Sequence, residues 1–455
     1  MITELSVHNF KSWLDVEAMK LAPITGLFGT NSSGKTSILQ LLLMLKQTVE
    51  SPDRAQALIF GDEKSTPVNL GSFREIVHGH DLNGKLSWNI QWSLPTNLEV
   101  KDPASEDSSL FASDKMGFAA EVAGATDRLQ VISMRYHLGD NSFSMRKKSS
   151  TGDKYDLKST APNFEFRRIQ GRPWDLPAPV KCYGFPDQVK AYFQNASFLA
   201  DLQLAFEAMF GRVYYLGPLR EYPKRQYTWA GAEPADMGQR GERVVDALLS
   251  AESRKRTISL GPGRGKKPRS LSEHVAWWLK ELGLVHSFKV EPLTKDSGIY
   301  MVKVKKSAQS AEALITDIGF GVSQILPALV LCYYVPEGST IILEQPEIHL
   351  HPSVQAGLAD VFIDAIKRRR VQIIFESHSE HLLRRLQRRI AEGALENRDT
   401  ALYFCEMCES RSILTPLQLD MFGAISNWPR DFFGDEFTEI AEMSKAALRR
   451  KQQGA

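Results

Sequence analysis

The segment Gly29 to Thr36 has the residue types and the spacing of a phosphate-binding loop. Its sequence, GTNSSGKT, fits the P-loop pattern G-x-x-x-x-G-K-[ST]. The apolar run Leu21 to Phe28 predicts a strand before the loop, and Ser37 to Val49 is apolar at helical spacing after it. Glycines allow the backbone to curl around phosphates, and the helix N-terminus faces their negative charge. We expect Lys35 to reach the β- and γ-phosphates and the Thr36 hydroxyl to hold Mg²⁺.

Three further segments could complete such a site. Thr316 to Gln324 is a Gly-rich, Ser-bearing turn that leads into an apolar helix, which is a second phosphate-binding device. Thr340 to Glu344 (TIILE) is an apolar strand that ends in an acid, and we expect it beside the P-loop strand, where Glu344 would serve Mg²⁺. Val371 to Phe375 is another such strand, followed by His378 at the position of a γ-phosphate sensor. A lone histidine is often structural, but this order of segments favours a role in the site.

The predicted site residues follow from these segments. ATP and Mg²⁺ are the predicted cofactors. The residues assigned to nucleotide binding are Gly29, Asn31, Ser32, Ser33, Gly34, Lys35, Thr36, Ser37, Gly321, Ser323 and Gln324. Those assigned to the metal are Thr36 and Glu344, and those assigned to catalysis are Glu344, Gln345, Glu347 and His378.

Composition sets limits on the class of protein. The 455 residues are 43% hydrophobic and 24% charged, which is ordinary for a globular chain, and the net charge of +2 by itself implies neither a nucleic-acid nor a membrane partner. The first residues do not form a secretory signal, and no apolar run is long enough to span a bilayer. Of the four cysteines, Cys405 and Cys408 form a lone C-x-x-C without a matching second pair. We therefore expect reduced cysteines and a cytoplasmic location.

The texture of the chain predicts an α/β protein in four parts. Residues 1–80 and 313–395 form the two parts of the ATPase core, 81–312 form a β-rich lobe with a helical insertion, and 396–455 form a small C-terminal α/β cap. Within the lobe, the polar stretch Asp102 to Ser113 is predicted to be a mobile loop between strands.

Two local alternatives stay open at this stage. Phe10 or Trp13 packs near the adenine or in the core. Arg220, in the segment YYLGPLREYP, contacts phosphate or a partner, or makes a surface ion pair.

The motifs together resemble those of ABC-type ATPases of the SMC/RecF/OLD superfamily, in the group of stand-alone, AAA-like bacterial P-loop ATPases. The resemblance rests on NFKSW, GTNSSGKT, LEQPEIHLHP and ESHSEHLL, with support from YYLGPLREYP and GFGVSQILP, and it covers residues 1–50 and 313–390. Several ATPases of this group occur in bacterial antiphage defence, where a partner effector carries the toxic chemistry. The resemblance implies a P-loop ATPase head that dimerises head to tail. In such a dimer, Ser323 of one subunit would cap the γ-phosphate held by the other, Glu344 would take the metal position, and His378 would sense the γ-phosphate.

The chain departs from this pattern at the catalytic acid. The metal-side acid is usually Asp, whereas here it is Glu344, and the usual catalytic-base position falls on Gln345. A glutamine orients water but does not accept its proton as a carboxylate does. Either Glu347 polarises the water, or hydrolysis is slow and the protein is an ATP-held switch. We predict slow turnover.

Two functions of different classes remain. The first is a dimeric or larger regulatory and sensor subunit that controls an effector protein, with no membrane partner. The second is an ATPase that binds double-stranded DNA for repair or end processing, and it rests on basic clusters at Arg254 to Arg256, Lys266 and Lys267, Lys367 to Arg370, and Arg384 to Arg389. The C-terminal acids Asp431, Asp435 and Glu436 form no D-x-D, so we expect a cap rather than a nuclease.

Overall fold

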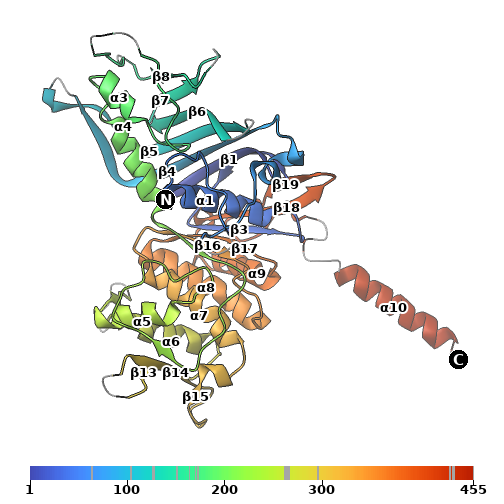
Figure 1. Ribbon diagram of the computed structural model, residues 1–455. Coiled ribbons are helices and arrows are strands. Elements are labelled where there is room, and N and C mark those ends of the chain that lie inside the picture. Colours follow the sequence, from blue (N-terminus) through green and yellow to red (C-terminus); the bar gives the residue numbers. More distant parts are fainter. Residues whose placement is uncertain are drawn as a thin grey trace.

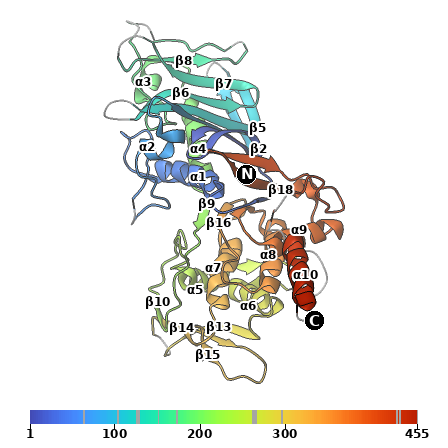
Figure 2. The ribbon, with the colours of Figure 1, turned by 90° about the vertical axis from the view of Figure 1, so that its right-hand side faces the viewer.

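The computed structural model contains two large sheets stacked along the molecule, with helices between and below them (Figures 1 and 2). It describes residues 1–453 except 63–64, 103–104, 125–128, 150–151, 163, 170, 172–173, 261–266, 295–296, 430–431 and 433–435. The acids Asp431 and Asp435 therefore lie outside the described residues.

The central sheet has six strands and carries the P-loop. Its strands, in spatial order, are β19 (Arg411–Pro416), β18 (Thr400–Cys408), β3 (Ile24–Gly29), β17 (Gln372–Glu376), β16 (Thr340–Glu344) and β9 (Val213–Leu216). All neighbours are parallel except β18 and β19. The expectation that the Glu344 strand lies beside the P-loop strand is wrong, because β17 lies between β16 and β3. The strands of the predicted C-terminal cap, β18 and β19, extend this sheet.

Alternate residues of the central strands enter two different cores, as the two-residue period of a strand requires. Ile342 and Ile374 pack on the face of helix α1 (Lys35–Glu50), whereas Ile341 and Ile373 pack on the opposite face. The helices of the opposite face are α5 (Val244–Ser253), α6 (Leu271–Glu281), α7 (Gly321–Tyr334), α8 (Pro352–Arg369) and α9 (Glu380–Ala391). Both faces are therefore covered, which explains why these strands are apolar along their whole length.

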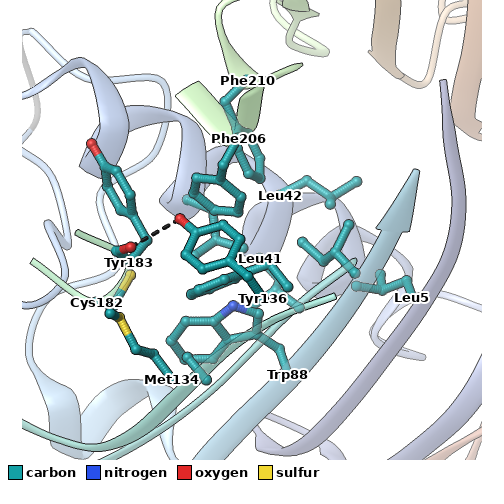
Figure 3. Packing of buried hydrophobic residues seen from close by; sticks show 14 of the residues in the cluster. Leu5, Leu41, Leu42, Trp88, Met134, Tyr136, Cys182, Tyr183, Phe206 and Phe210 are labelled. Atoms are coloured by element: carbon teal, nitrogen blue, oxygen red, sulfur yellow. Dashed lines mark hydrogen bonds between the residues drawn. The ribbon is translucent and has the colours of Figure 1, made fainter. Parts of the chain in front are cut away.

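The second large sheet is antiparallel and packs with α1 into one core. Its order is β2 (Trp13–Lys20), β1 (Ile2–Phe10), β4 (Lys85–Asp102), β5 (Ser105–Gly124), β6 (Leu129–Leu138), β7 (Asn141–Lys147) and β8 (Tyr155–Ser159). Helix α4 (Leu199–Phe210) fills the space beside α1, where Phe206 lies against Tyr136 (Figure 3). The tyrosine hydroxyl donates a hydrogen bond to the carbonyl of Tyr183 at 2.9 Å.

The sequence predicted most of the longer elements. The predicted loop Asp102 to Ser113 is wrong over residues 105–113, which belong to β5 and pair with β4. The strands β2 and β8 were not predicted, and neither were the two-residue strands β10, β11, β12 and β15. The remaining short elements are α2 (Phe73–Ile76), α3 (Asp187–Tyr192), η1 (His78–His80), η2 (Ile315–Asp317), η3 (Asn397–Asp399), β10 (Tyr227–Thr228), β11 (Thr257–Ile258), β12 (Arg269–Ser270), β13 (Ser287–Pro292), β14 (Ile299–Lys305) and β15 (Ala313–Leu314).

The last helix, α10 (Glu436–Gln453), projects away from the rest of the molecule in Figure 1. Within the part of the chain that the structure describes, no helix has both the length and the apolar composition to cross a membrane.

Candidate nucleotide-binding site

The P-loop adopts the backbone that its glycines predict. Gly29 and Gly34 have φ of 139° and 88°, and Ser32 between them also has a positive φ of 58°. A Cβ at Gly29 would lie 2.0 Å from the backbone oxygen of Cys405 on β18. A side chain at Gly29 is therefore excluded both by the backbone conformation and by the neighbouring strand.

The NFKSW segment contacts the P-loop through Trp13. Trp13 is fully buried, and its Nε1–H donates to the carbonyl of Gly34 at 2.9 Å. Phe10 is also fully buried. Both aromatic residues pack in the core, so of the two alternatives for Phe10 and Trp13 the structure favours core packing over the adenine.

Lys35 and its neighbours form the cradle at the start of α1. Lys35 is buried, and its Nζ donates to the carbonyls of Gly29 and Thr30 at 3.1 and 2.6 Å. Its burial lowers the pKa of the Lys35 ammonium. Asn31 and Ser32 are exposed at the mouth of the loop, whereas Ser33 is buried and donates to the Thr30 carbonyl; Ser37 is half-buried. A bound phosphate could replace the loop carbonyls as the partner of Lys35.

Two carboxylates meet at the carboxyl edge of the sheet. Glu344 and Glu376 end β16 and β17, and they pair directly in the parallel register. Both share the strand face of Ile342 and Ile374, which is the α1 face. The Thr36 hydroxyl donates to Glu376 Oε2 at 2.7 Å.

Sequence reasoning assigned the acid beside the P-loop to Glu344 and missed Glu376. The signal for Glu376 was its position at the end of an apolar strand, the same position that Glu344 holds. Glu344 Oε1 instead accepts a hydrogen bond from the hydroxyl of Tyr215, which sequence reasoning also missed, at 2.8 Å.

These carboxylates suit a divalent cation. Burial and the neighbouring Glu376 raise the pKa of Glu344 to about 7. Burial also raises the pKa of Glu376. Two buried carboxylates repel each other, and a divalent cation beside the Thr36 hydroxyl would relieve that repulsion. Thr36, Glu344 and Glu376 are therefore the residues that fit Mg²⁺.

Glu347 is held against the end of β17. Its Oε1 accepts from the Ser377 hydroxyl at 2.7 Å and from the His378 backbone N–H at 2.8 Å. Its Oε2 is buried and has no partner among the described residues. Burial raises the pKa of Glu347. This arrangement leaves one carboxylate oxygen free for a water molecule.

The other two residues predicted to be catalytic are Gln345, two positions before Glu347, and His378, whose backbone N–H binds Glu347. Gln345 has a positive φ of 42°, and its N–H donates to the Glu376 carbonyl at 3.1 Å, so it continues the sheet edge. His378 is exposed, and partial burial together with the Lys35 ammonium lowers its pKa. The lowered pKa favours the neutral imidazole.

The turn predicted to bind phosphate at the start of α7 lies apart from the P-loop. Gly321, Ser323 and Gln324 form the first turn of α7, on the face of the sheet opposite α1 (Figure 1). The Ser323 hydroxyl donates to the Phe320 carbonyl at 2.9 Å. Among the described residues, no hydrogen bond joins this turn to the P-loop of the same chain.

The basic clusters are largely ion-paired. Arg385 and Arg389 both bind Asp360, with closest distances of 2.6 Å. The other pairs are Arg254 and Arg256 with Glu233, Arg368 with Asp364, Arg369 with Glu337, Arg384 with Glu380, and Arg388 with Glu392. Lys266 lies outside the described residues.

Three family models match parts of the chain. A model described as "AAA ATPase domain" matches residues 1–155, and one described as "AAA domain, putative AbiEii toxin, Type IV TA system" matches residues 244–384. A third, "Protein of unknown function (DUF3696)", matches residues 395–443. The first two contain the P-loop, the α7 turn, both acid-ended strands and His378. They confirm the prediction of a P-loop ATPase.

Solved structures with a similar arrangement include SMC head domains. The chain is 9% identical to the "SMC head domain from Thermotoga maritima", with a TM-score of 0.43 over 92% of this chain and 99% of that chain. It is 10% identical to an Smc head domain bound to the C-terminal domain of ScpA derived from Pyrococcus furiosus, with a TM-score of 0.44 over 92% and 96%. At these values the similarity carries no argument about the site. No curated protein matches the sequence.

Proposed function

From the premise that the chain is a P-loop ATPase, we propose that it is an ATP-held switch of the ABC and SMC-like class. In this proposal ATP closes a head-to-tail dimer, or a larger homo-oligomer, in the cytoplasm. The closed form controls a separate effector protein in antiphage defence. The family description that names a toxin of a type IV system supports a context of this kind.

The proposal rests on one observation. The two helices whose N-termini are predicted to bind phosphate lie on opposite faces of one sheet. The P-loop with Lys35 opens α1 on one face, and the Gly321 turn opens α7 on the other. A nucleotide on the P-loop therefore lacks the second turn unless another copy supplies it. Phe320, immediately before that turn, is 55% exposed and available to such a partner.

The proposed chemistry assigns each residue a task. The P-loop amides and Lys35 bind the phosphates, and Thr36, Glu344 and Glu376 would hold Mg²⁺, which supplies charge neutralisation on the phosphates when bound. Glu347 Oε2 accepts a proton from the attacking water, because that oxygen is buried and has no partner among the described residues. Gln345 cannot take this proton, so Glu347, two residues beyond the usual base position, takes it, and we propose that this replacement makes turnover slow.

The decisive experiment mixes two inactive variants. Lys35→Ala removes the P-loop lysine, and Gly321→Glu places a carboxylate where the proposal puts the partner's γ-phosphate. A Cβ at Gly321 would meet only Leu284, at 3.5 Å, and an acid at a helix N-terminus favours the helix, so the second variant should fold. Each variant alone should lose ATP turnover.

Mixing should restore activity because a mixed dimer has one site with both halves intact. Random exchange predicts about a quarter of wild-type turnover, since half of the dimers are mixed and each holds one good site of two. A mixture that stays inactive although both variants are folded and exchange subunits would contradict the shared site. Full turnover by Gly321→Glu alone would contradict it as well.

The DNA-acting alternative is tested by turnover with and without duplex DNA, with Lys35→Ala as the blank. The ion pairs of Arg385 and Arg389 with Asp360 lead us to expect no stimulation. Strong stimulation that falls with salt would favour the alternative.

A further inference from the structure

Arg220 is a buried cation with unsatisfied donors at the edge of the sheet that carries the candidate site. It follows β9 by four residues and is 7% exposed. Its Nη2 makes one long hydrogen bond, 3.5 Å, to the carbonyl of Glu344. Its Nε and Nη1 have no partner among the described residues. Neither the surface ion pair nor an exposed partner contact, two of the alternatives left open by the sequence, fits a side chain in this position.

The backbone around Arg220 is fixed, so the guanidinium is held in place. The N–H of Gly217 donates to the Gln239 carbonyl at 2.8 Å, and the N–H of Glu221 donates to the Arg240 carbonyl at 2.9 Å. Both hydrogen bonds tie the loop to a neighbouring segment, one on each side of Arg220. A donor group held in this way loses little conformational freedom when a ligand binds.

Arg220 lies at the carboxyl edge of the sheet, because its Nη2 reaches the carbonyl of Glu344, the residue that ends β16 and pairs with Glu376. The guanidinium of an arginine stays charged in proteins. Burial lowers the pKa of both Arg220 and Lys35, whereas Glu347 favours the charged form of each. Glu347 therefore lies within electrostatic reach of two cations, Lys35 of the P-loop and Arg220.

Unpaired charged donors are costly when buried, so an acceptor is expected at Nε and Nη1 in the working protein. A charged guanidinium donates strong hydrogen bonds to phosphate oxygens. The phosphate nearest to the acids on a nucleotide held by Lys35 is the terminal one. We propose that Arg220 donates a free guanidinium N–H to the γ-phosphate of ATP and thereby makes the site distinguish ATP from ADP. This inference rests on the proposed ATP-binding function.

The test compares the affinity for two nucleotides. Calorimetric titration of the full chain with Mg²⁺ gives the dissociation constants of a non-hydrolysable ATP analogue and of ADP. The variants are Arg220→Ala, Arg220→Lys, Lys35→Ala and the matched control Arg225→Ala. Arg225 is close in sequence, but its side chain is 68% exposed and pairs with Asp317 on the surface.

We expect Arg220→Ala to raise the dissociation constant of the ATP analogue by about tenfold to a hundredfold, the range for charge-assisted hydrogen bonds. The dissociation constant of ADP should change by no more than about twofold, because ADP has no γ-phosphate. Arg220→Lys keeps the charge but loses the planar guanidinium donors, so it should lose part of the analogue affinity. Arg225→Ala should bind both nucleotides as the wild type does.

Three results would overturn the inference. Unchanged analogue affinity in Arg220→Ala would mean that water serves the free donors. An equal loss for ADP and the analogue would mean that Arg220 supports the fold rather than the γ-phosphate. If Arg220→Ala is unfolded by circular dichroism, Arg220→Lys decides, and full analogue affinity there overturns the inference. Failure of the proposed function itself looks different, because Lys35→Ala would then bind both nucleotides normally.

Discussion

Lys181 lies in the segment after the β-rich sheet and hydrogen-bonds to the end of the P-loop helix. We predict that removing its ammonium group lowers the free energy of unfolding. Lys181 is buried, and its Nζ donates to the carbonyls of Thr48, Val49 and Ser51 at 2.7, 3.0 and 2.7 Å. The last carbonyls of a helix have no partner within the helix and carry partial negative charge. One lysine therefore satisfies three acceptors at the end of α1.

The magnitude follows from what Lys181→Met leaves behind. Methionine replaces the apolar stem but donates to none of the three carbonyls. An unpaired buried acceptor costs about 1–3 kcal/mol, which applies in full at the buried hydrogen bond to Thr48 and in part at the other two, where water can enter. Burial lowers the pKa of Lys181, so the variant also relieves a desolvation cost. We expect a net loss of about 2–3 kcal/mol in the free energy of unfolding.

Urea unfolding followed by circular dichroism measures this loss. Lys190→Met is the matched control, because Lys190 lies on α3, nine positions along the chain, and is exposed. The control should unfold as the wild type does, and Lys181→Arg should recover part of the loss because it keeps the charge and the donors. A change below about 0.5 kcal/mol in Lys181→Met would refute the reasoning, since it would show that water replaces the lysine at no cost.

Three further predictions concern the site. Gly29→Ala should abolish ATP binding and lower the melting temperature, because its Cβ would lie 2.0 Å from the Cys405 carbonyl oxygen; binding near the wild-type level in a titration would contradict this. Trp13→Phe removes the hydrogen bond to Gly34, so the free energy of unfolding in a urea titration should fall by about 1 kcal/mol. An unchanged free energy of unfolding would show that another group replaces this hydrogen bond. Glu347→Gln should lower turnover at least about tenfold with ATP affinity unchanged, and steady-state rates equal to the wild type would remove Glu347 from the water-activating role.

The parts of the site that follow from local patterns could be predicted from the sequence. The P-loop needs a particular order of residues within eight positions, and its glycines adopt the expected positive φ. Glu344 could be placed at the end of a strand, and His378 just after one, because short apolar runs bounded by polar residues mark buried strands. Each of these inferences uses neighbours in the chain only.

The partner of Thr36 could not be predicted because it depends on the order of strands in the sheet. Strand order is set by packing between segments more than 300 residues apart, and placing β17 rather than β16 beside β3 brings Glu376 to Thr36. The prediction of a loop at residues 105–113 was wrong for a related reason. Its composition is polar and typical of loops, but pairing with β4 satisfies its backbone. In both cases a distant segment decides the local outcome.

The contacts of α1 indicate how a change at the nucleotide would reach the rest of the molecule. At its start, Trp13 of β2 bonds to Gly34, and at its end Lys181 holds three carbonyls. Because β2 belongs to the antiparallel sheet and Lys181 follows it in the chain, α1 is tied at both ends to the β-rich side. The α7 turn packs instead in the core on the other face of the central sheet. A displacement of the P-loop would therefore act directly on the β-rich sheet, whereas among the described residues α7 packs in the other core and meets the P-loop helix through the strands of the central sheet.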